Sequence, residues 1–290
     1  MPELPEVETI ARGLAKRVTG DVIESVWLGS KPEPLKSPAK EIARVLEGNR
    51  ISGVRRVGKH IVFDLERVAR TLSFTKKTPK ESAGKRAHPI KGEKAQWVVH
   101  LGMTGRMLVA DPTEVLAKHT HAVATLKSGR ELRFVDPRRL GRLSVASGFE
   151  PGGKEPLDIS LGDFISLFRG RKTPIKSALL NQKLLRGVGN IYADESLFRS
   201  GIRPKRKASS LAKDDLSRLH PAIQDVLREA IALGGSTVSD YVDSDGEEGF
   251  FQLRHRVYGR EDEPCLVCKT PIKRVVIGGR SSHYCPKCQK

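Results

Sequence analysis

Residues 265–288 read CLVCKTPIKRVVIGGRSSHYCPKC, so two Cys-x2-Cys pairs are separated by sixteen residues. This spacing is typical of two tight turns whose thiolates close a tetrahedral zinc site. Two disulfides or four free thiols are the alternatives. All four cysteines lie in the last 26 residues, however, whereas a disulfide scaffold would spread them along the chain. The stretch therefore predicts one structural zinc, bound by Cys265, Cys268, Cys285 and Cys288.

The residues between the two pairs predict a β-hairpin. Residues 275–277 are apolar and β-branched, and Gly278-Gly279 follow as a turn that would present Arg280. Structural zinc can hold such a hairpin where a hydrophobic core is missing. His283 lies beside the second pair but would be a fifth ligand, so it is not counted as one.

The charge of the chain indicates a polyanionic partner. Its 52 lysines and arginines outweigh 34 acidic residues, which gives a formal charge of +18. Such a field attracts nucleic acid, although a merely solvated basic surface is the alternative. No stretch approaches the roughly 18 to 20 apolar residues of a membrane span, and the first six residues do not resemble a secretory signal. We therefore expect a cytoplasmic protein, with room for two domains in 290 residues.

The first half of the chain predicts one helix followed by a β-rich domain. Apolar residues recur at helical spacing over residues 5–18. From about 21 to 145 the pattern changes to short β-like runs joined by turn signals, which favours a β-sandwich or barrel. The runs are Asp21–Leu28, Ile51–Val57, His60–Leu65, Gln96–Leu101, Arg106–Ala110, His121–Lys127 and Glu131–Val135.

A linker and a basic insertion interrupt this organisation. Residues 148–157 are rich in glycine and proline, and we place the domain boundary there, after residue 147. Residues from about 67 to 95 show almost no periodicity and carry seven lysines and arginines after Arg70, as expected of a basic loop.

The second half predicts three helices. The first would begin with Thr173 as N-cap and Pro174 at the first helical position, and would end near Leu185. The second would start at Ile191. The third would cover about 211–233, with a kink at Pro221.

The loop Arg186-Gly-Val-Gly-Asn190 precedes the second of these helices. Its glycines would let backbone N–H groups approach an anion closely, and the helix dipole favours a phosphate there. An ordinary glycine-rich turn between helices is the alternative.

The N-terminal stretch Met1-Pro-Glu-Leu-Pro-Glu-Val-Glu8 resembles the start of the bacterial formamidopyrimidine-DNA glycosylase and endonuclease VIII family. The resemblance continues in order through nearly the whole chain, apart from the basic insertion. It is carried by Val57-Gly-Lys-His60, His100-Leu-Gly-Met-Thr-Gly105, Lys118-His-Thr-His121, Asp136-Pro-Arg-Arg-Leu-Gly141, Lys183-Leu-Leu-Arg-Gly-Val-Gly-Asn-Ile-Tyr-Ala-Asp-Glu195 and the four cysteines.

The resemblance implies an α+β chain in two domains. The N-terminal catalytic domain, residues 1–147, would be a β-sandwich with flanking helices. Residues 158–254 would form a helix-two-turn-helix DNA-binding domain, and 255–290 a zinc finger with a β-hairpin. The partner would be double-stranded DNA with oxidised bases or abasic sites, bound by a monomer that associates with the nucleoid.

The chemistry of Pro2 agrees with this resemblance. Once Met1 is removed, Pro2 has a free secondary amine, and α-amino groups titrate near pH 8, so a nucleophilic fraction exists at neutral pH. Attack on the sugar C1′ would expel the damaged base and leave an iminium. That electron sink acidifies the C2′ proton, so elimination of both flanking phosphates can follow.

Further site residues are implied by the family match. Glu3 would act as acid and base near the sugar, supported by Glu6, while Lys59 and Arg280 would bind the flanking phosphates. A methionine, an arginine and an apolar wedge would fill the gap left by the flipped nucleotide. The gap-filling residues match Met103, Arg138 and Leu140, and the remaining DNA contacts match His119, Arg138, Arg139, Lys172 and Asn190.

Residues 236–249 match the loop that covers an extruded oxidised purine in the guanine-repair branch, which favours 8-oxoguanine and formamidopyrimidines. Most members of that branch have phenylalanine where this chain has Leu140, so opposite-base preference is left open. An endonuclease VIII-like enzyme for oxidised pyrimidines is one alternative. A non-catalytic zinc-finger DNA-binding protein is another, but it would not need Pro2, Glu3, Glu6 and Lys59 together.

Overall fold

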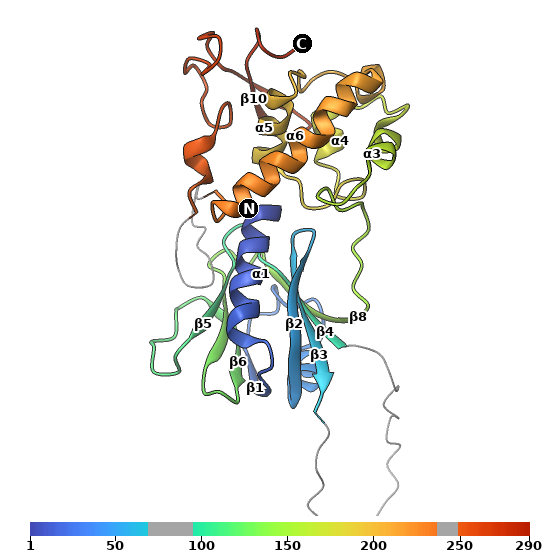
Figure 1. The fold of residues 1–290 in the computed structure, drawn as a ribbon. Coiled ribbons are helices and arrows are strands. Elements are labelled where there is room, and N and C mark those ends of the chain that lie inside the picture. The colour runs from blue at the N-terminus through green and yellow to red at the C-terminus, as the bar shows by residue number, and fades with distance from the viewer. Residues whose placement is uncertain (69–94, 237–248) are drawn as a thin grey trace, which may run out of the picture.

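The computed structural model describes residues 1–68, 95–236 and 249–290 (Figure 1). The basic insertion and the predicted lesion-covering loop lie almost wholly outside these residues. Two bodies stand one above the other: a β-rich domain that follows the N-terminus and a helical domain that carries the C-terminal finger.

The N-terminal domain contains two four-stranded antiparallel sheets. One has the order β2-β3-β4-β8 and the other β1-β6-β7-β5. Their inner faces enclose a core that includes Phe63, Trp97 and Phe134. The predicted β-sandwich is therefore confirmed. The strands are β1 (Ile23–Leu28), β2 (Asn49–Val57), β3 (His60–Arg67), β4 (Ala95–His100), β5 (Arg106–Ala110), β6 (Thr120–Leu126), β7 (Glu131–Val135) and β8 (Arg142–Ser147).

Helix α1 (Leu4–Val18) belongs to both domains. Its first residue, Leu4, packs in the core of the helical domain, whereas Val7, Ile10 and Leu14 pack in the sandwich core. The second flanking helix, α2 (Ala39–Leu46), buries Ile42 and Leu46 and contacts β1. Because α1 crosses from one core to the other, the N-terminus lies at the junction of the two domains (Figure 1).

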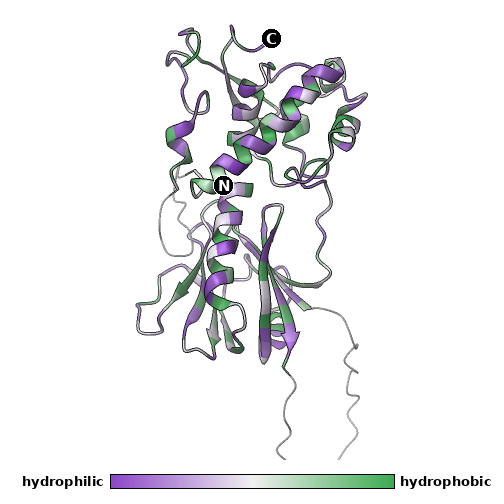
Figure 2. Cartoon of the chain, in the orientation of Figure 1, coloured by the Kyte–Doolittle hydropathy of each residue, from purple (hydrophilic) through white to green (hydrophobic). Residues whose placement is uncertain are grey.

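The helical domain contains α3 (Leu161–Phe168), α4 (Ile175–Leu179), α5 (Asn190–Arg199) and α6 (Lys213–Ala232), with short 3-10 turns at Ala208–Ser210 and Phe251–Arg254. Figure 2 shows alternating hydrophilic and hydrophobic bands along α6, as expected of a helix with one buried face. Helix α6 continues through Pro221. The linker is held to it, because Gln224 and Arg228 donate to the carbonyl oxygen of Leu157.

The prediction for the first helix of this domain was wrong at both ends. Pro174, not Thr173, is the N-cap of α4, and the helix ends at Leu179 rather than near Leu185. Residues 181–185 form a turn instead, in which the N–H groups of Leu184 and Leu185 donate to the carbonyl oxygen of Asn181. The next helix, α5, begins one residue before the predicted Ile191.

The C-terminal finger contains the predicted hairpin. Strands β9 (Lys273–Ile277) and β10 (Arg280–Tyr284) pair antiparallel, and Gly278-Gly279 make the turn with positive φ angles. Arg280 therefore stands exposed at the start of β10. Within the described part of the chain, no helix is long and apolar enough to span a bilayer.

Candidate active site

The N-terminus is fixed at the domain junction by a hydrogen-bonded cap. Glu3 is the N-cap of α1, and its backbone N–H donates to Glu6 Oε2 at 2.8 Å, one half of a capping box. The N–H of Leu4 donates across the junction to the carbonyl oxygen of Gly187 at 3.0 Å. Pro2 is therefore held on a backbone that both domains fix.

The glycine-rich loop binds an anion, but this anion belongs to the protein. Glu3 Oε1 accepts the N–H of Ile191, in the first turn of α5, at 3.3 Å. A Cβ atom on Gly189 would lie only 2.1 Å from the Glu3 carboxyl carbon, so only glycine allows this approach. The Glu3 carboxylate thus lies at this helix end, and the expected phosphate contact of the loop stays a prediction.

Burial changes the acidity of the groups around Pro2. Glu3 is 5% exposed, and desolvation raises its pKa to about 6, although the positive charge of Lys59 opposes the shift. Lys59 is 8% exposed, and burial lowers its pKa. It lies in the two-residue turn between β2 and β3, where Gly58 has a φ of +60°. A carboxyl group with this pKa can both give and take a proton near neutral pH.

Glu6 is held by two partners that sequence patterns did not reveal. The hydroxyl of Tyr192, on α5, donates to Glu6 Oε1, and so does the N–H of Ser236 at 2.8 Å. All three residues are buried, and desolvation raises the pKa of Glu6. Ser236 is the first of the residues predicted to cover the lesion. Glu6 therefore connects the base of that segment to the cap of α1.

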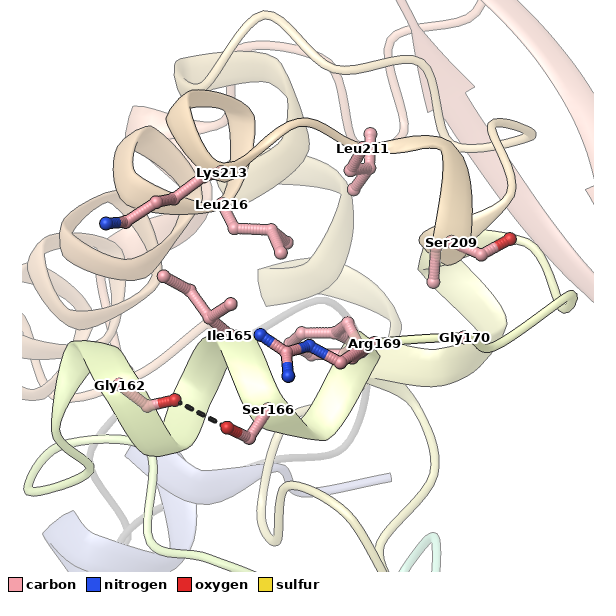
Figure 3. Close-up of a pocket in the computed structure, with 11 residues that line it drawn as sticks. Gly162, Ile165, Ser166, Arg169, Gly170, Ser209, Leu211, Lys213 and Leu216 are labelled. Atoms are coloured by element: carbon pink, nitrogen blue, oxygen red, sulfur yellow. Dashed lines mark hydrogen bonds between the residues drawn. The ribbon is translucent and has the colours of Figure 1, made fainter.

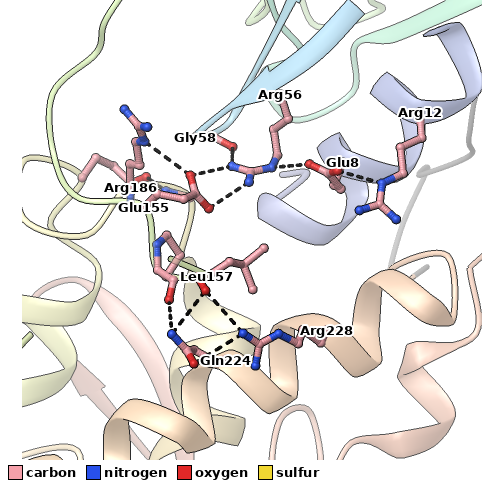
Figure 4. Close-up of polar contacts among 12 residues, drawn as sticks. Glu8, Arg12, Arg56, Gly58, Glu155, Leu157, Arg186, Gln224 and Arg228 are labelled. Carbon is pink, nitrogen blue, oxygen red and sulfur yellow. Dashed lines mark hydrogen bonds and ion pairs between the residues drawn. The ribbon is translucent and has the colours of Figure 1, made fainter. Parts of the chain in front are cut away.

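An ion-pair network holds the Lys59 turn against both domains (Figure 4). The side chain of Arg56 is buried and pairs with Glu8 of α1 at 2.7 Å and with Glu155 of the linker at 2.8 Å. It also donates to the carbonyl oxygen of Gly58, next to Lys59, at 3.3 Å. Arg186 reaches the same Glu155 carboxylate from the glycine-rich loop. Loss of Glu8 or Glu155 would leave the buried Arg56 guanidinium with one anionic partner fewer, which destabilises the position of the turn.

The predicted gap-filling side chains come from two loops that touch. Met103 is 45% exposed and Leu140 is 44% exposed. A Cβ atom on Gly102 would lie 2.6 Å from the carbonyl carbon of Leu140, so the loops pack backbone to backbone. Asp136, fully buried, joins them by accepting from Thr104 Oγ1 at 2.5 Å and from the N–H of Gly141 at 2.7 Å. Nothing in the local sequence pattern singled out Asp136 for this role.

Buried charges attach the hairpin that carries Arg280 to the helical domain. The Nζ of Lys176, on α4, contacts Asp194 Oδ1 of α5 at 2.6 Å and donates to the carbonyl oxygen of Ser281 at 2.6 Å. Asp194 also accepts the N–H of His283 at 2.8 Å. The side chains of Lys176 and Asp194 are fully buried, so the pair is strongly desolvated and needs all these partners.

The four cysteines fit one zinc ion. Their Sγ atoms all lie within 4.8 Å of one another, and the Cys265–Cys288 and Cys268–Cys285 pairs are 3.9 Å and 3.4 Å apart. Tetrahedral coordination with Zn–S bonds near 2.3 Å requires sulfur atoms about 3.8 Å apart. No disulfide joins them. The finger therefore holds one structural zinc, and the predicted cofactor is confirmed.

The other predicted residues are placed as follows. Glu3, Glu6 and Lys59 come together at the N-terminus, while Asn190 lies at the start of α5 and donates to Ser281 Oγ at 3.3 Å. His119, Arg138, Arg139 and Lys172 are exposed. A pocket of about 450 Å³ between α3 and α6 contains none of the predicted residues and is not the candidate site (Figure 3).

The fold and the site together define a class of protein. A buried carboxyl group and a buried lysine lie near the chain terminus, in a chain of formal charge +18, and this arrangement suits an enzyme that acts on a polyanion. No other described region brings the predicted catalytic groups together.

Comparison with known proteins identifies the family. The Formamidopyrimidine-DNA glycosylase N-terminal domain matches residues 1–143, its H2TH domain matches 153–242, and the zinc finger found in FPG and IleRS matches 262–290. A formamidopyrimidine-DNA glycosylase of Solibacter usitatus is 43% identical over 294 residues, with both chains fully covered. This chain belongs to the formamidopyrimidine-DNA glycosylase family.

Comparison with solved structures supports the same family assignment. The MutM (Fpg) protein of Thermus thermophilus is 39% identical, with a TM-score of 0.81 over 99% of this chain and 98% of that one. Lactococcus lactis Fpg bound to N7-benzyl-Fapy-dG DNA has a TM-score of 0.84 at 29% identity and full coverage of both chains. The same protein bound to abasic DNA has a TM-score of 0.84 at 28% identity, with 99% of each chain covered.

Proposed function

We propose that this chain excises oxidised purines from duplex DNA through the amine of Pro2 and then cleaves the strand at the resulting abasic site. It is a DNA-formamidopyrimidine glycosylase with lyase activity, acting in base excision repair. The observation that carries the residue assignment is the Glu3 carboxyl group, with a pKa near 6, held at the chain terminus beside Lys59. Such an enzyme would work in the cytoplasm, on the nucleoid.

The reaction follows from the groups present. The neutral Pro2 nitrogen attacks C1′, the glycosidic bond breaks, and protonated Glu3 supplies the proton that leaves with the base. The C1′–O4′ bond then breaks, O4′ takes up the proton that the Pro2 nitrogen loses, and an iminium joins Pro2 to the opened sugar. The iminium so formed acidifies C2′. Ionised Glu3 removes that proton, and the C3′–O bond breaks as the 3′ phosphate leaves. A second elimination releases the 5′ phosphate. Lys59 and Arg280 stabilise the departing phosphates, and no step requires the zinc.

Three observations support oxidised purines as the substrate class. A similar structure contains a formamidopyrimidine derivative of guanine. The sequence match over 236–249 favours the same branch, and the Glu6–Ser236 hydrogen bond links the base of that segment to the catalytic cap. Leu140 can fill the space of the flipped nucleotide but cannot stack as an aromatic ring would, so we expect weaker kinking than with phenylalanine.

The pH dependence of base excision tests the role of Glu3. Excision requires protonated Glu3, whose pKa is about 6, and neutral Pro2, whose amine titrates near pH 8. Below about pH 6 the rate should rise with pH as the amine loses its proton. Between about 6 and 8 it should be flat, because the gain in neutral amine is offset by the loss of protonated Glu3. Above about 8 it should fall.

Glu3→Gln should lower base excision by about 10²–10⁴-fold, since the amide cannot deliver a proton. Its residual rate should rise up to about pH 8 without a break near 6, because only the amine then titrates. Single-turnover excision from an 8-oxoguanine duplex would measure both profiles. DNA binding should be retained. A Glu3→Gln profile that still breaks near pH 6 would assign that ionisation to another group.

Deletion of residues 70–93 should leave catalysis on a short duplex nearly unchanged. Strand β3 has eight residues and spans about 23 Å, so the chain leaves the sheet at Arg67, far from Lys59. The segment adds positive charge, so its loss should weaken DNA affinity at low salt, and the difference should shrink as salt rises. Binding and cleavage at several salt concentrations would measure this. If the deletion abolished cleavage of a pre-formed abasic site, the segment would belong to the active site.

A further inference from the structure

A second pocket lies beside the Leu140 loop, and none of the reaction steps uses it. Its volume is about 400 Å³, within the range of small-ligand sites, and its walls come from β1, from the chain around 118–121 and from the 136–141 loop. We call it the Trp27 pocket and define it by five of its lining residues: Trp27, Lys31, Lys118, His119 and Arg139.

Trp27 stands on the outer face of β1 rather than in the core. Its neighbours Val26 and Leu28 pack against the sandwich core, whereas Trp27 is 50% exposed. Gly29 is also close to the ring, since a Cβ atom there would lie 3.5 Å from the indole Cη2. The sandwich core does not include this side chain, so half of a large aromatic surface is available for a planar ligand.

The walls around the indole are positively charged. Lys31 and Lys118 are exposed. Arg139 has a φ of +54°, a left-handed conformation, and its guanidinium pairs with Glu33 at 2.9 Å in a solvent-exposed contact. Among the described residues that line the pocket, none is acidic. An aromatic face surrounded by cations matches a nucleotide, whose base can stack while its phosphate is neutralised.

The pocket is continuous with the proposed DNA-binding face. It includes His119 and Arg139, both predicted DNA contacts, and Leu140 follows Arg139 directly. Under the proposed function the Leu140 loop takes the place of the flipped nucleotide, which puts the undamaged strand on the far side of that loop from Pro2. We propose that the Trp27 pocket binds one nucleotide of the undamaged strand, with its base against the indole and its phosphate between Lys31, Lys118 and Arg139. This inference rests on the proposed function, in that DNA is the ligand.

Equilibrium binding to a duplex with a non-cleavable tetrahydrofuran abasic site tests the pocket. Trp27→Ala should weaken binding at least about fivefold, the lower end for one lost base–aromatic stack. The slope of log affinity against log salt should not change, because no charge is removed. Trp27→Phe should retain most of the affinity. Lys31→Ala should make that slope shallower by about 0.9. Lys40 lies on α2, outside the pocket, and is the control: in a Lys40→Ala protein, Trp27→Ala should cause the same loss of affinity as in the unaltered protein.

The strand assignment has its own test. Two duplexes are needed, in which the undamaged strand is shortened from one side or from the other until it ends opposite the lesion. On one of these two duplexes, Trp27→Ala and the unaltered protein should bind with equal affinity. If the difference disappears only when the lesion strand is shortened, or if Trp27→Ala binds every duplex normally, the proposal is wrong.

Borohydride trapping on a natural abasic site separates this proposal from the proposed function. At saturating protein, Trp27→Ala should trap DNA at the normal rate, because the pocket holds DNA but does not touch the reacting atoms. A reduced trapping rate at saturation would overturn a pure binding role. If the unaltered protein itself failed to trap, the Pro2 mechanism would be wrong, and the binding comparison on tetrahydrofuran DNA could still be read.

Discussion

Retention of Met1 should lower borohydride trapping of abasic DNA by a factor of about 100 or more. With Met1 in place the Pro2 nitrogen is part of a peptide bond and cannot attack C1′. The only terminal amine then lies one residue, about 3.8 Å, from the required position, and small misplacements of a reacting group can cost about a hundredfold in rate. An N-terminally extended protein, incubated with abasic duplex and sodium borohydride and resolved on a denaturing gel, measures the loss.

Two variants show that a free amine at this position is the requirement. Pro2→Gly keeps such an amine and should still trap DNA, whereas Lys59→Ala should weaken base removal but leave abasic-site trapping detectable. Peptide mass spectrometry should place the reduced cross-link on the Pro2 nitrogen. A cross-link on Lys59, together with full activity of the Met1-retaining protein, would show that the nucleophile is a lysine.

Replacing Cys265 or Cys288 by serine should eliminate DNA binding. The finger buries few apolar side chains besides Val257 and Ile272, so its fold depends on the metal. Structural zinc contributes about 10–16 kcal/mol to such peptides near neutral pH. Losing a ligand should unfold β9 and β10 and remove Arg280 from the site. Bound zinc, measured by elemental analysis, should fall from one per chain to near zero, and gel-shift binding should fall with it.

Val267→Ala is the matched control, because Val267 lies between the first two cysteines and is largely exposed. It should keep zinc and affinity. Short exposure to EDTA should also leave activity intact, since an amine, a carboxyl group and protein cations carry out the chemistry. A Cys288→Ser protein that binds and cuts DNA normally would contradict the role of the finger in presenting Arg280.

The elements that the sequence predicted well are those with long or strongly patterned apolar faces. Helices α1 and α6 and seven of the strands fall in this group. Helices α2 and α3 and strand β8 were missed because each is short and buries few residues. In α3 only Phe164 and Phe168 are buried, and in β8 only Leu143 is. Two buried side chains in eight residues are too few to establish a helical period.

The chemistry of the site was predicted from motifs, but its organisation was not. The side-chain partners of Glu6 and Asp136 come from segments distant in the sequence, such as Tyr192 on α5 and Thr104 before β5. No local periodicity encodes such contacts. The glycine-rich loop illustrates the same limit, because its pattern predicts an anion near the helix end but does not say that the anion is Glu3.

The division of α1 between two hydrophobic cores has a consequence for how the enzyme could be assembled. Residues 1–3 precede the sandwich in the sequence. Leu4, however, is buried in the core of the helical domain, and its N–H donates to the carbonyl oxygen of Gly187 in that domain. A gene split at the linker would yield a sandwich whose first turn of helix is uncovered and frays, and a helical half with a hole where Leu4 inserts. Neither half alone would retain a positioned nucleophile.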